Sequence, residues 1–392
     1  MINPVSKIDC LLHNCIQEVR RNPQDCFNHP DSAFTREHGP FTFENTIMAS
    51  VTQGKMNMDD DASHRFFEAH NPSRFGTPSA FIQAKEKNLP ECFRKLNELF
   101  VEKSAPLIPD ILYKGCRLLG HDGTKVNMAP DPTNPDCWFP PKKEDGKGYS
   151  QFHLNAMTDM GTGMIVDFQI QPGRCSSERA ATRDMAARYS DDIPAIQVAD
   201  RGFESFALIV WLIINRIRFV IRGRDIHSNG IASSVRDLPE GEFDIDWNIK
   251  LTTRHTIETL SNPHKYKVLN RAQFEDIPEM YDLHLRIVRI QISEDSYEIL
   301  LTNLDREEFP RECLKEIYFK RWGIEVEYFK LKYRIGLNRF QSKKPDLIMI
   351  EVASRILFHN ICTVLSCIIE PDTKGRSPDG YKLDFSAFAT WL

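Results

Sequence analysis

The 392-residue sequence lacks any uninterrupted apolar run of the ~18–20 residues that a membrane span needs. Its longest apolar run, residues 206–214, fits a buried helix. Glu351, Arg355 and His359 interrupt the apolar segment 347–369 at four-residue steps, which predicts a helix with one polar stripe. The N-terminus has no basic start followed by an apolar core, so we expect no signal peptide. These absences favour a cytoplasmic protein with no membrane partner.

Cysteine patterns typical of zinc sites are also missing. The ten cysteines include no Cys-x-x-Cys pair, and no histidine pair completes a zinc motif, so we expect reduced thiols in the core. A net positive charge is absent as well, because the formal net charge is −5. That balance excludes a uniformly basic protein that coats nucleic acid, but it allows a local basic patch to bind phosphates.

No internal repeat or low-complexity tract divides the chain, and its length predicts two or three domains. Helical spacing dominates the beginning and predicts helices at 5–20, 41–51, 62–70, 78–87 and 91–103. Thr77 and Pro78 are typical of a helix start. We expect a helical N-terminal DNA-binding region, a catalytic domain in two parts, a β-rich insertion between the parts, and a C-terminal tail. Their ranges are 1–105, 106–222 with 310–370, 223–309, and 371–392.

The first part of the expected catalytic domain alternates strands and helices. The predicted order is strand-strand-strand-helix-strand-helix-strand, with Asp122 at the end of the first strand and Asp200 at the end of the fourth. That order is the ribonuclease H-like α/β pattern. Residues 223–309 break the alternation with turns and strands, of which the clearest are a hairpin formed by 285–292 and 297–304.

One helix predicted over Tyr318–Lys332 carries unusual chemistry. At 3.6 residues per turn, Tyr318, Arg321, Glu325 and Lys332 fall within a sector roughly 60° wide. Helical ion pairs on a solvated surface would explain a charged face by themselves. The coincidence with two upstream acids at strand ends favours an active site instead.

Three carboxylates from different elements can hold two divalent ions about 3.5–4 Å apart, the arrangement that cleaves phosphodiesters. Hard Mg²⁺ prefers such oxygen ligands, and Mn²⁺ can substitute. We therefore expect Asp122, Asp200 and Glu325 to be the catalytic metal ligands. Arg321 and Lys332 on the same helix face can hold phosphates near these ions.

The spacing Tyr-x₂-Arg-x₃-Glu-x₆-Lys, complete from Tyr318 to Lys332, resembles the signature of DDE transposases of the insertion-sequence 4 family, the group of transposon five. Asp122-Gly123-Thr124 resembles the family's first-acid motif. Asp200 and the Arg-Gly-Phe after it resemble the second. The similarity extends from about residue 40 to about residue 360, and the gap between Asp200 and Glu325 matches the family's β-rich insertion.

This resemblance implies a DNA transposase. It would bind the terminal inverted repeats of its element as a homodimer in a synaptic complex, cut them with Mg²⁺, and join the 3′ ends to target DNA. Tyr318 and Arg321 would hold the backbone near a flipped base, and Lys332 the terminal phosphate. Trp247, the single tryptophan of the predicted insertion, would stack on that base, or would be a core residue.

Further DNA contacts are open to two interpretations. The helix from Pro78 could read DNA through Ser79, Gln83 and Lys85, or could be an ordinary amphipathic helix. Lys330 belongs to a local basic stripe around the C-terminal helix, which fits DNA binding. Arg201 follows Asp200 directly and could orient its carboxylate or bind a phosphate.

His121 and His153 could assist proton transfer or be structural. The remaining rivals are a nuclease that does not join strands and a non-catalytic DNA-binding protein, either a transposition inhibitor or a repressor.

Overall fold

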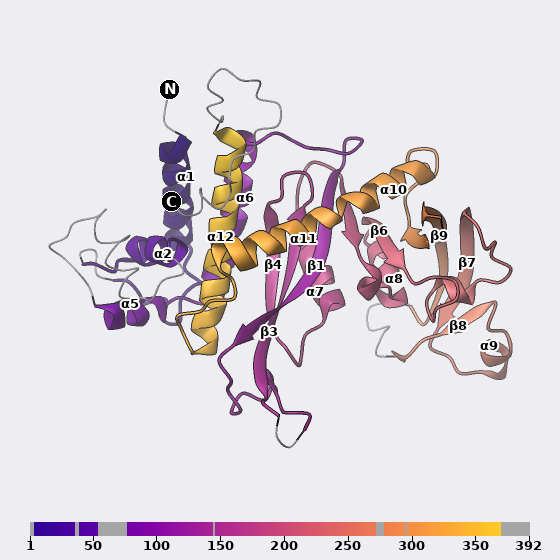
Figure 1. Ribbon diagram of the computed structural model, residues 1–392, viewed down its shortest axis with the longest axis horizontal. Helices are drawn as coiled ribbons and strands as arrows, with labels where there is room; N and C mark the ends of the chain where they lie inside the picture. The colour runs from indigo at the N-terminus through magenta and orange to yellow at the C-terminus, as the bar shows by residue number, and fades with distance from the viewer. Residues whose placement is uncertain are drawn as a thin grey trace.

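A ten-stranded sheet runs through the middle of the molecule in the computed structural model (Figure 1). The structure describes residues 4–35, 39–53, 77–143, 146–271, 278–294 and 296–369. Within these residues the strand order is β2-β3-β1-β5-β6-β10-β9-β7-β8, and β4 pairs with β3. The protein is therefore a mixed α/β fold with one large sheet.

Five strands make the part of the sheet that carries the two aspartates. Strands β3 and β4 are antiparallel to each other, and β3 is antiparallel to β1, whereas β1, β5 and β6 are parallel. Parallel neighbours need a crossover, and two helices, α7 and α8, provide it. The bounds are β1 Arg117–Met128, β2 Trp138–Phe139, β3 Tyr149–Asp159, β4 Ile165–Pro172, α7 Glu178–Arg188, β5 Ala195–Ala199, the short η3 Arg201–Phe203, α8 Phe206–Ile214 and β6 Arg218–Gly223.

The predicted first strand was too short. Strand β1 continues to Met128, so Asp122 lies inside it and not at its end. The reason is that β3 continues beside it, pairing Met128 with Ser150. Asp200 does follow the last residue of β5, as predicted.

The strands after β6 extend the same sheet. Strand β10 pairs antiparallel with β6, so residues 243–302 continue the sheet begun by β1 and β5. The predicted hairpin is confirmed as β9 and β10, which pair antiparallel. The bounds are η4 Ala232–Ser234, β7 Phe243–Thr252, α9 Ile257–Ser261, β8 Tyr266–Val268, β9 Met280–Ser293 and β10 Ser296–Thr302.

The N-terminal helices form a layer against the last helix of the described chain (Figure 1). They share one apolar core with that helix and with β3 and β4. The bounds are α1 Pro4–Arg21, α2 Phe43–Val51, α5 Pro78–Lys85, α6 Pro90–Ser104, η2 Ala105–Leu107 and α12 Pro345–Ile368. These bounds confirm the predicted helices at 5–20, 41–51, 78–87 and 91–103 to within a few residues, whereas a helix predicted at 62–70 lies outside the described residues.

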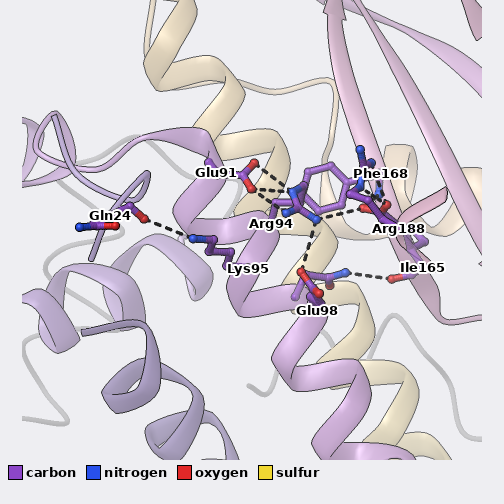
Figure 2. Close-up of polar contacts among 10 residues, drawn as sticks. Gln24, Glu91, Arg94, Lys95, Glu98, Ile165, Phe168 and Arg188 are labelled. Carbon is purple, nitrogen blue, oxygen red and sulfur yellow. Dashed lines mark hydrogen bonds and ion pairs between the residues drawn. The ribbon is translucent and has the colours of Figure 1, made fainter. Parts of the chain in front are cut away.

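Charged side chains connect this helical layer to the sheet. Arg94 of α6 contacts Glu91 at 2.6 Å and reaches toward the carboxylate of Asp167 on β4 at 3.7 Å. Arg188 of α7 binds the same Asp167 carboxylate at 2.8 Å, and Figure 2 shows Arg94 and Arg188 in this cluster. The shared carboxylate joins α6, β4 and α7.

The segment predicted as one helix over Tyr318–Lys332 has three parts. Helix α10 covers Arg311–Lys320, α11 covers Trp322–Phe329, and the π-helical turn η6 covers Lys330–Ile335. Together they lie across the sheet as one rod (Figure 1). The rod ends at Gly336, whose φ of 95° is a left-handed conformation that glycine adopts without strain.

Among the described residues, α12 is the one helix that is long and apolar enough to cross a membrane. However, 94% of its apolar 18-residue stretch is buried inside the protein. Its predicted polar stripe points into the protein, because Glu351, Arg355 and His359 are all buried. Helix α12 is thus a core helix between the N-terminal layer and the sheet.

Candidate active site

The strand register places two of the predicted acids side by side. In the parallel ladder, His121 of β1 pairs with Ala199 of β5, and Asp122 and Asp200 come next. Asp122 Oδ1 accepts a hydrogen bond from Gly123 N at 2.8 Å, and Asp200 Oδ1 accepts one from Gly202 N at 2.7 Å. Each backbone bond fixes one carboxylate oxygen and leaves Oδ2 for another ligand.

The surroundings of Asp122 disfavour the charged form of its carboxyl group. Burial raises the pKa of its carboxyl to about 6, against the lowering effects of the Gly123 N–H and of Arg321. The negative charges of Asp200 and Glu178 raise this pKa further. A cation bound beside a buried group of carboxylates would stabilise their charged forms.

Glu325 lies near the pair but is not drawn into it. Its side chain is 51% exposed, and its Oε1 is 3.6 Å from Arg321 Nη2. In the described ranges, no three His, Cys, Asp or Glu side chains are close enough together to hold one metal ion. The third predicted ligand therefore stands at the margin of the site.

Helix α11, which carries Glu325, approaches β1 very closely. A Cβ added to Gly120 would lie 2.1 Å from Ile324 Cδ1 and 3.2 Å from Met160 Cγ. Tyr328 of the same helix donates a hydrogen bond to the backbone oxygen of Asp122 at 2.7 Å. Glycine at 120 is what permits this helix to rest on the strand beside the aspartates.

Arg321 and Tyr318 form a buried unit next to the aspartates. Arg321 is 5% exposed, and its guanidinium lies 5.5 Å from the ring centroid of Tyr318. Burial by itself would lower the pKa of Arg321, but Tyr318, Asp122 and Asp200 together raise it. The buried guanidinium is therefore a fixed positive charge facing the acids.

Lys332 also faces Asp122. Burial lowers the pKa of its ammonium group, and the negative charge of Asp122 opposes that shift. The structure thus brings Lys332, Arg321, Asp122 and Asp200 together, from two strands and one interrupted helical rod.

Other predicted DNA contacts lie elsewhere. Ser79 and Gln83 are exposed on α5, and Arg201 is exposed beside Asp200. Lys330 binds Glu327 at 2.8 Å. Ser79 and Gln83 belong to the N-terminal layer, a different part of the fold from the acids.

Two expectations for DNA contacts need correction. Lys85 is completely buried and pairs with Glu351 of α12 at 3.1 Å, so its ammonium group serves the core and not a surface. Trp247 of β7 is 9% exposed and lies 6.4 Å from the Phe206 ring, so the core alternative holds. A tryptophan on an alternating strand is drawn inward by its apolar area.

The two histidines differ. His121 is fully buried with Nε2 2.6 Å from Gln197 Oε1, and burial lowers its pKa to about 4, which favours the structural alternative. His153 contacts Glu178 Oε1 at 3.0 Å near the aspartates. Sequence reasoning missed Glu178, because the spacing along the chain gave no sign that the start of α7 lies beside Asp122.

Comparison with known proteins identifies the family of this chain. The sequence model of the family described as transposase DDE domain matches residues 117–361. Transposase InsG for insertion sequence element IS4, from Escherichia coli (strain K12), is 20% identical over 317 residues, which are 80% of this chain and 66% of InsG. The chain therefore spans just under two thirds of that relative.

Among solved structures, the cryo-EM structure of the piggyBac transposase synaptic complex with hairpin DNA gives a TM-score of 0.48 at 12% identity. The match covers 100% of this chain and 79% of that one.

Proposed function

This chain belongs to the transposase DDE domain family, and from that premise we propose that it is the transposase of an insertion sequence of the IS4 type. It would bind the terminal inverted repeats of its element, cut them, and join them to target DNA. The observation that carries this proposal is the placement of Asp122 beside Asp200, with the buried Arg321 guanidinium near enough to interact electrostatically with both. Stability alone does not require two such acids side by side.

Divalent metal ions are the family's cofactor, and the donor set suits two Mg²⁺ ions or Mn²⁺ in their place. Asp122, Asp200 and Glu325 offer only carboxylate oxygens, which are the ligands these hard ions prefer. Such ions, when bound, activate the attacking hydroxyl and stabilise the leaving oxygen. To become a metal ligand, the exposed carboxylate of Glu325 would leave its 3.6 Å contact with Arg321 and turn toward the two aspartates.

Positive groups of the rod would hold the DNA. Arg321 is held by burial against Tyr318, so its side chain would lose little further conformational entropy on binding a phosphate. Lys332 is also close enough to Asp122 to feel its charge, and it would contact a terminal phosphate. Arg201, exposed beside Asp200, would add a third phosphate contact.

We also propose the domain division 1–105, 106–222 with 310–370, 223–309 and 371–392. The strand order β4-β3-β1-β5-β6 supports a ribonuclease H-like catalytic domain, and β7 to β10 support a β-rich insertion that extends its sheet. End recognition would use the exposed Ser79 and Gln83 of α5, and two chains would meet in the synaptic complex.

A cleavage assay tests this function. DNA carrying the inverted repeats that flank the gene is incubated with the full chain and Mg²⁺. We expect Asp122→Asn, Asp200→Asn and Glu325→Gln each to lower cleavage at least about 100-fold, because removing one ligand breaks the metal site. Glu312→Gln, at the exposed start of α10, is the control and should cleave as the unchanged chain does. Undiminished cleavage by all three variants would refute the proposal.

A second assay separates the rivals. A pre-cut end with a free 3′-hydroxyl should be joined to target DNA by a transposase, whereas a simple nuclease would leave it unjoined. DNA binding without any metal-dependent cleavage would identify a non-catalytic inhibitor or repressor.

The size of the complex with end DNA, measured by light scattering, should correspond to two chains.

A further inference from the structure

A cavity lies in the part of the chain between β6 and β9, where the turn at η4 faces α9 and β8. Its volume is about 460 Å³. Arg236, Lys267 and the imidazole of His264 line it, together with Ser233 and Ser234 of η4. Among the described residues, no carboxylate lines it. The polar part of the lining therefore suits an anion.

The positive charges of this cavity have no acidic partner in the described part of the chain. No described carboxylate oxygen lies within 4.0 Å of a side-chain nitrogen of Arg236, His264 or Lys267. Glu258 of α9, an acid close by, instead accepts a hydrogen bond from the Tyr266 hydroxyl at 2.7 Å. Arg236 and His264 are exposed, and Lys267 is half-buried. Positive groups that no acid neutralises attract anions to an open cavity.

The segment after Asp200 contacts both walls of the cavity. The buried carboxylate of Glu204 accepts a hydrogen bond from the N–H of Ile231, the residue before η4. The ammonium group of Lys267 lies 5.7 Å from the ring centroid of Phe206, the first residue of α8. Phe206 follows Asp200 by six positions, which span at most about 21 Å. A duplex held at the aspartates covers that distance within one helical turn of about 34 Å.

We propose that this cavity is a second DNA contact, which binds backbone phosphates through Arg236 and Lys267, with His264 beside them. The inference rests on the proposed function, because it presumes DNA at the two aspartates. Contacts to phosphates fix the position of a protein on a duplex without reading its sequence. The cavity would thus hold the duplex close to the cleavage site, whatever the base sequence there.

The salt dependence of DNA binding tests this inference. The full chain without metal is titrated into labelled end DNA, and into an unrelated duplex, at about 50 to 200 mM KCl, and fluorescence anisotropy gives the affinity. One phosphate contact contributes about 0.9 to the slope of log K against log salt, so Arg236→Gln and Lys267→Gln should each reduce the slope by about 0.9. Each should weaken both duplexes by the same factor, because backbone contacts carry no sequence information.

Arg254→Gln is the matched control. It also removes one positive charge from the segment between β6 and β9, but Arg254 is exposed and already paired with Glu279 at 2.8 Å. The slope for Arg254→Gln should therefore equal that of the unchanged chain. Thermal melting shows whether each variant is folded, and Arg236 is exposed, so its replacement should leave the core intact.

Three outcomes would overturn the inference, and they can be told apart. If Arg236→Gln and Lys267→Gln keep the slope of the unchanged chain while Asp122→Asn still loses cleavage, the cavity does not contact DNA and the proposed function stands. If the cavity takes free phosphate in place of DNA, equilibrium dialysis with labelled inorganic phosphate will show binding that both variants lose, again with an unchanged DNA slope. If the unchanged chain binds neither duplex, the proposed function fails, and this inference fails with it.

Discussion

Lys85 offers a sharp test of how the N-terminal layer is attached to the catalytic part. Its ammonium group lies 3.1 Å from Glu351 Oε1 and 2.9 Å from Gln53 Oε1, and the Lys85 and Glu351 side chains are 0% and 1% exposed. Replacing Lys85 by Met removes the cation and keeps most of the side-chain volume. Glu351 is then a buried carboxylate without its ammonium partner.

The expected loss follows from the contacts that remain. Breaking a buried ion pair by removing one partner costs about 3–5 kcal/mol. Glu351 keeps hydrogen bonds from the Ser342 hydroxyl at 2.6 Å and from the Gln341 N–H at 3.0 Å, so we expect the lower end, about 3 kcal/mol. The double variant Lys85→Met with Glu351→Gln should recover only part of that loss, because it removes the buried carboxylate without its ammonium partner but also takes away the 3.7 Å partner of buried Arg355.

Urea unfolding followed by circular dichroism measures this free energy. Gln83→Ala, an exposed neighbour on α5, is the matched control and should change stability by less than about 0.5 kcal/mol. If Lys85→Met unfolds at the same urea concentration as the unchanged chain but binds end DNA more weakly, the buried-pair reasoning is refuted. Lys85 would then be the DNA contact that the sequence first suggested.

Two further predictions concern β1. Gly120→Ala would press a methyl group against Ile324, costing about 1–3 kcal/mol and displacing the helix that carries Glu325, so cleavage should fall. Adding Ile324→Ala to Gly120→Ala should restore part of the stability and part of the cleavage activity. If Gly120→Ala leaves cleavage or the melting temperature unchanged, the close approach of α11 to β1 would be contradicted. His121 has a folded pKa of about 4 against an ordinary 6.5, so the stability that its neutral form contributes is complete above pH 6.5. It is lost as the pH falls toward 4, by up to about 3 kcal/mol. In urea unfolding at pH 7 and pH 4.5, His121→Gln should lack this part of the acid sensitivity, and an equal acid loss in both proteins would exclude His121 as its source.

The sequence predicted the elements of this fold better than their exact ends. Local signals such as the Thr77 cap and the apolar spacing of α1 gave most helices, because capping and periodicity are encoded within a few residues. The length of β1 beyond Asp122 was missed, because it depends on pairing with β3. The interruption of the rod at Arg321 and in η6 was also missed, since helical spacing is nearly the same across it.

For the site, the motif spacing carried more information than side-chain type did. Arg321 and Lys332 lie beside Asp122 as the helix geometry predicted. Lysine on an amphipathic helix suggested a surface for Lys85, and only the partner on α12, 266 positions away, explains its burial. Glu178 could not be predicted, because the space it fills is defined by two glycines from separate segments, Gly123 within β1 and Gly202 in the turn after β5.

The pairing of β6 with β10 has a consequence for the order in which this protein folds. Ile221 pairs with Leu301, about 80 positions later, and closing a loop of that length costs about 4 kcal/mol of chain entropy. The aspartates need only β1 and β5, but α10 packs on β6 and β9, and Glu325 follows α10 in the chain. The position of Glu325 thus depends on the strands of 243–302 through α10, as well as on the direct contact of α11 with β1. Refolding should therefore form the Asp122–Asp200 pair first and complete the site in a slower phase.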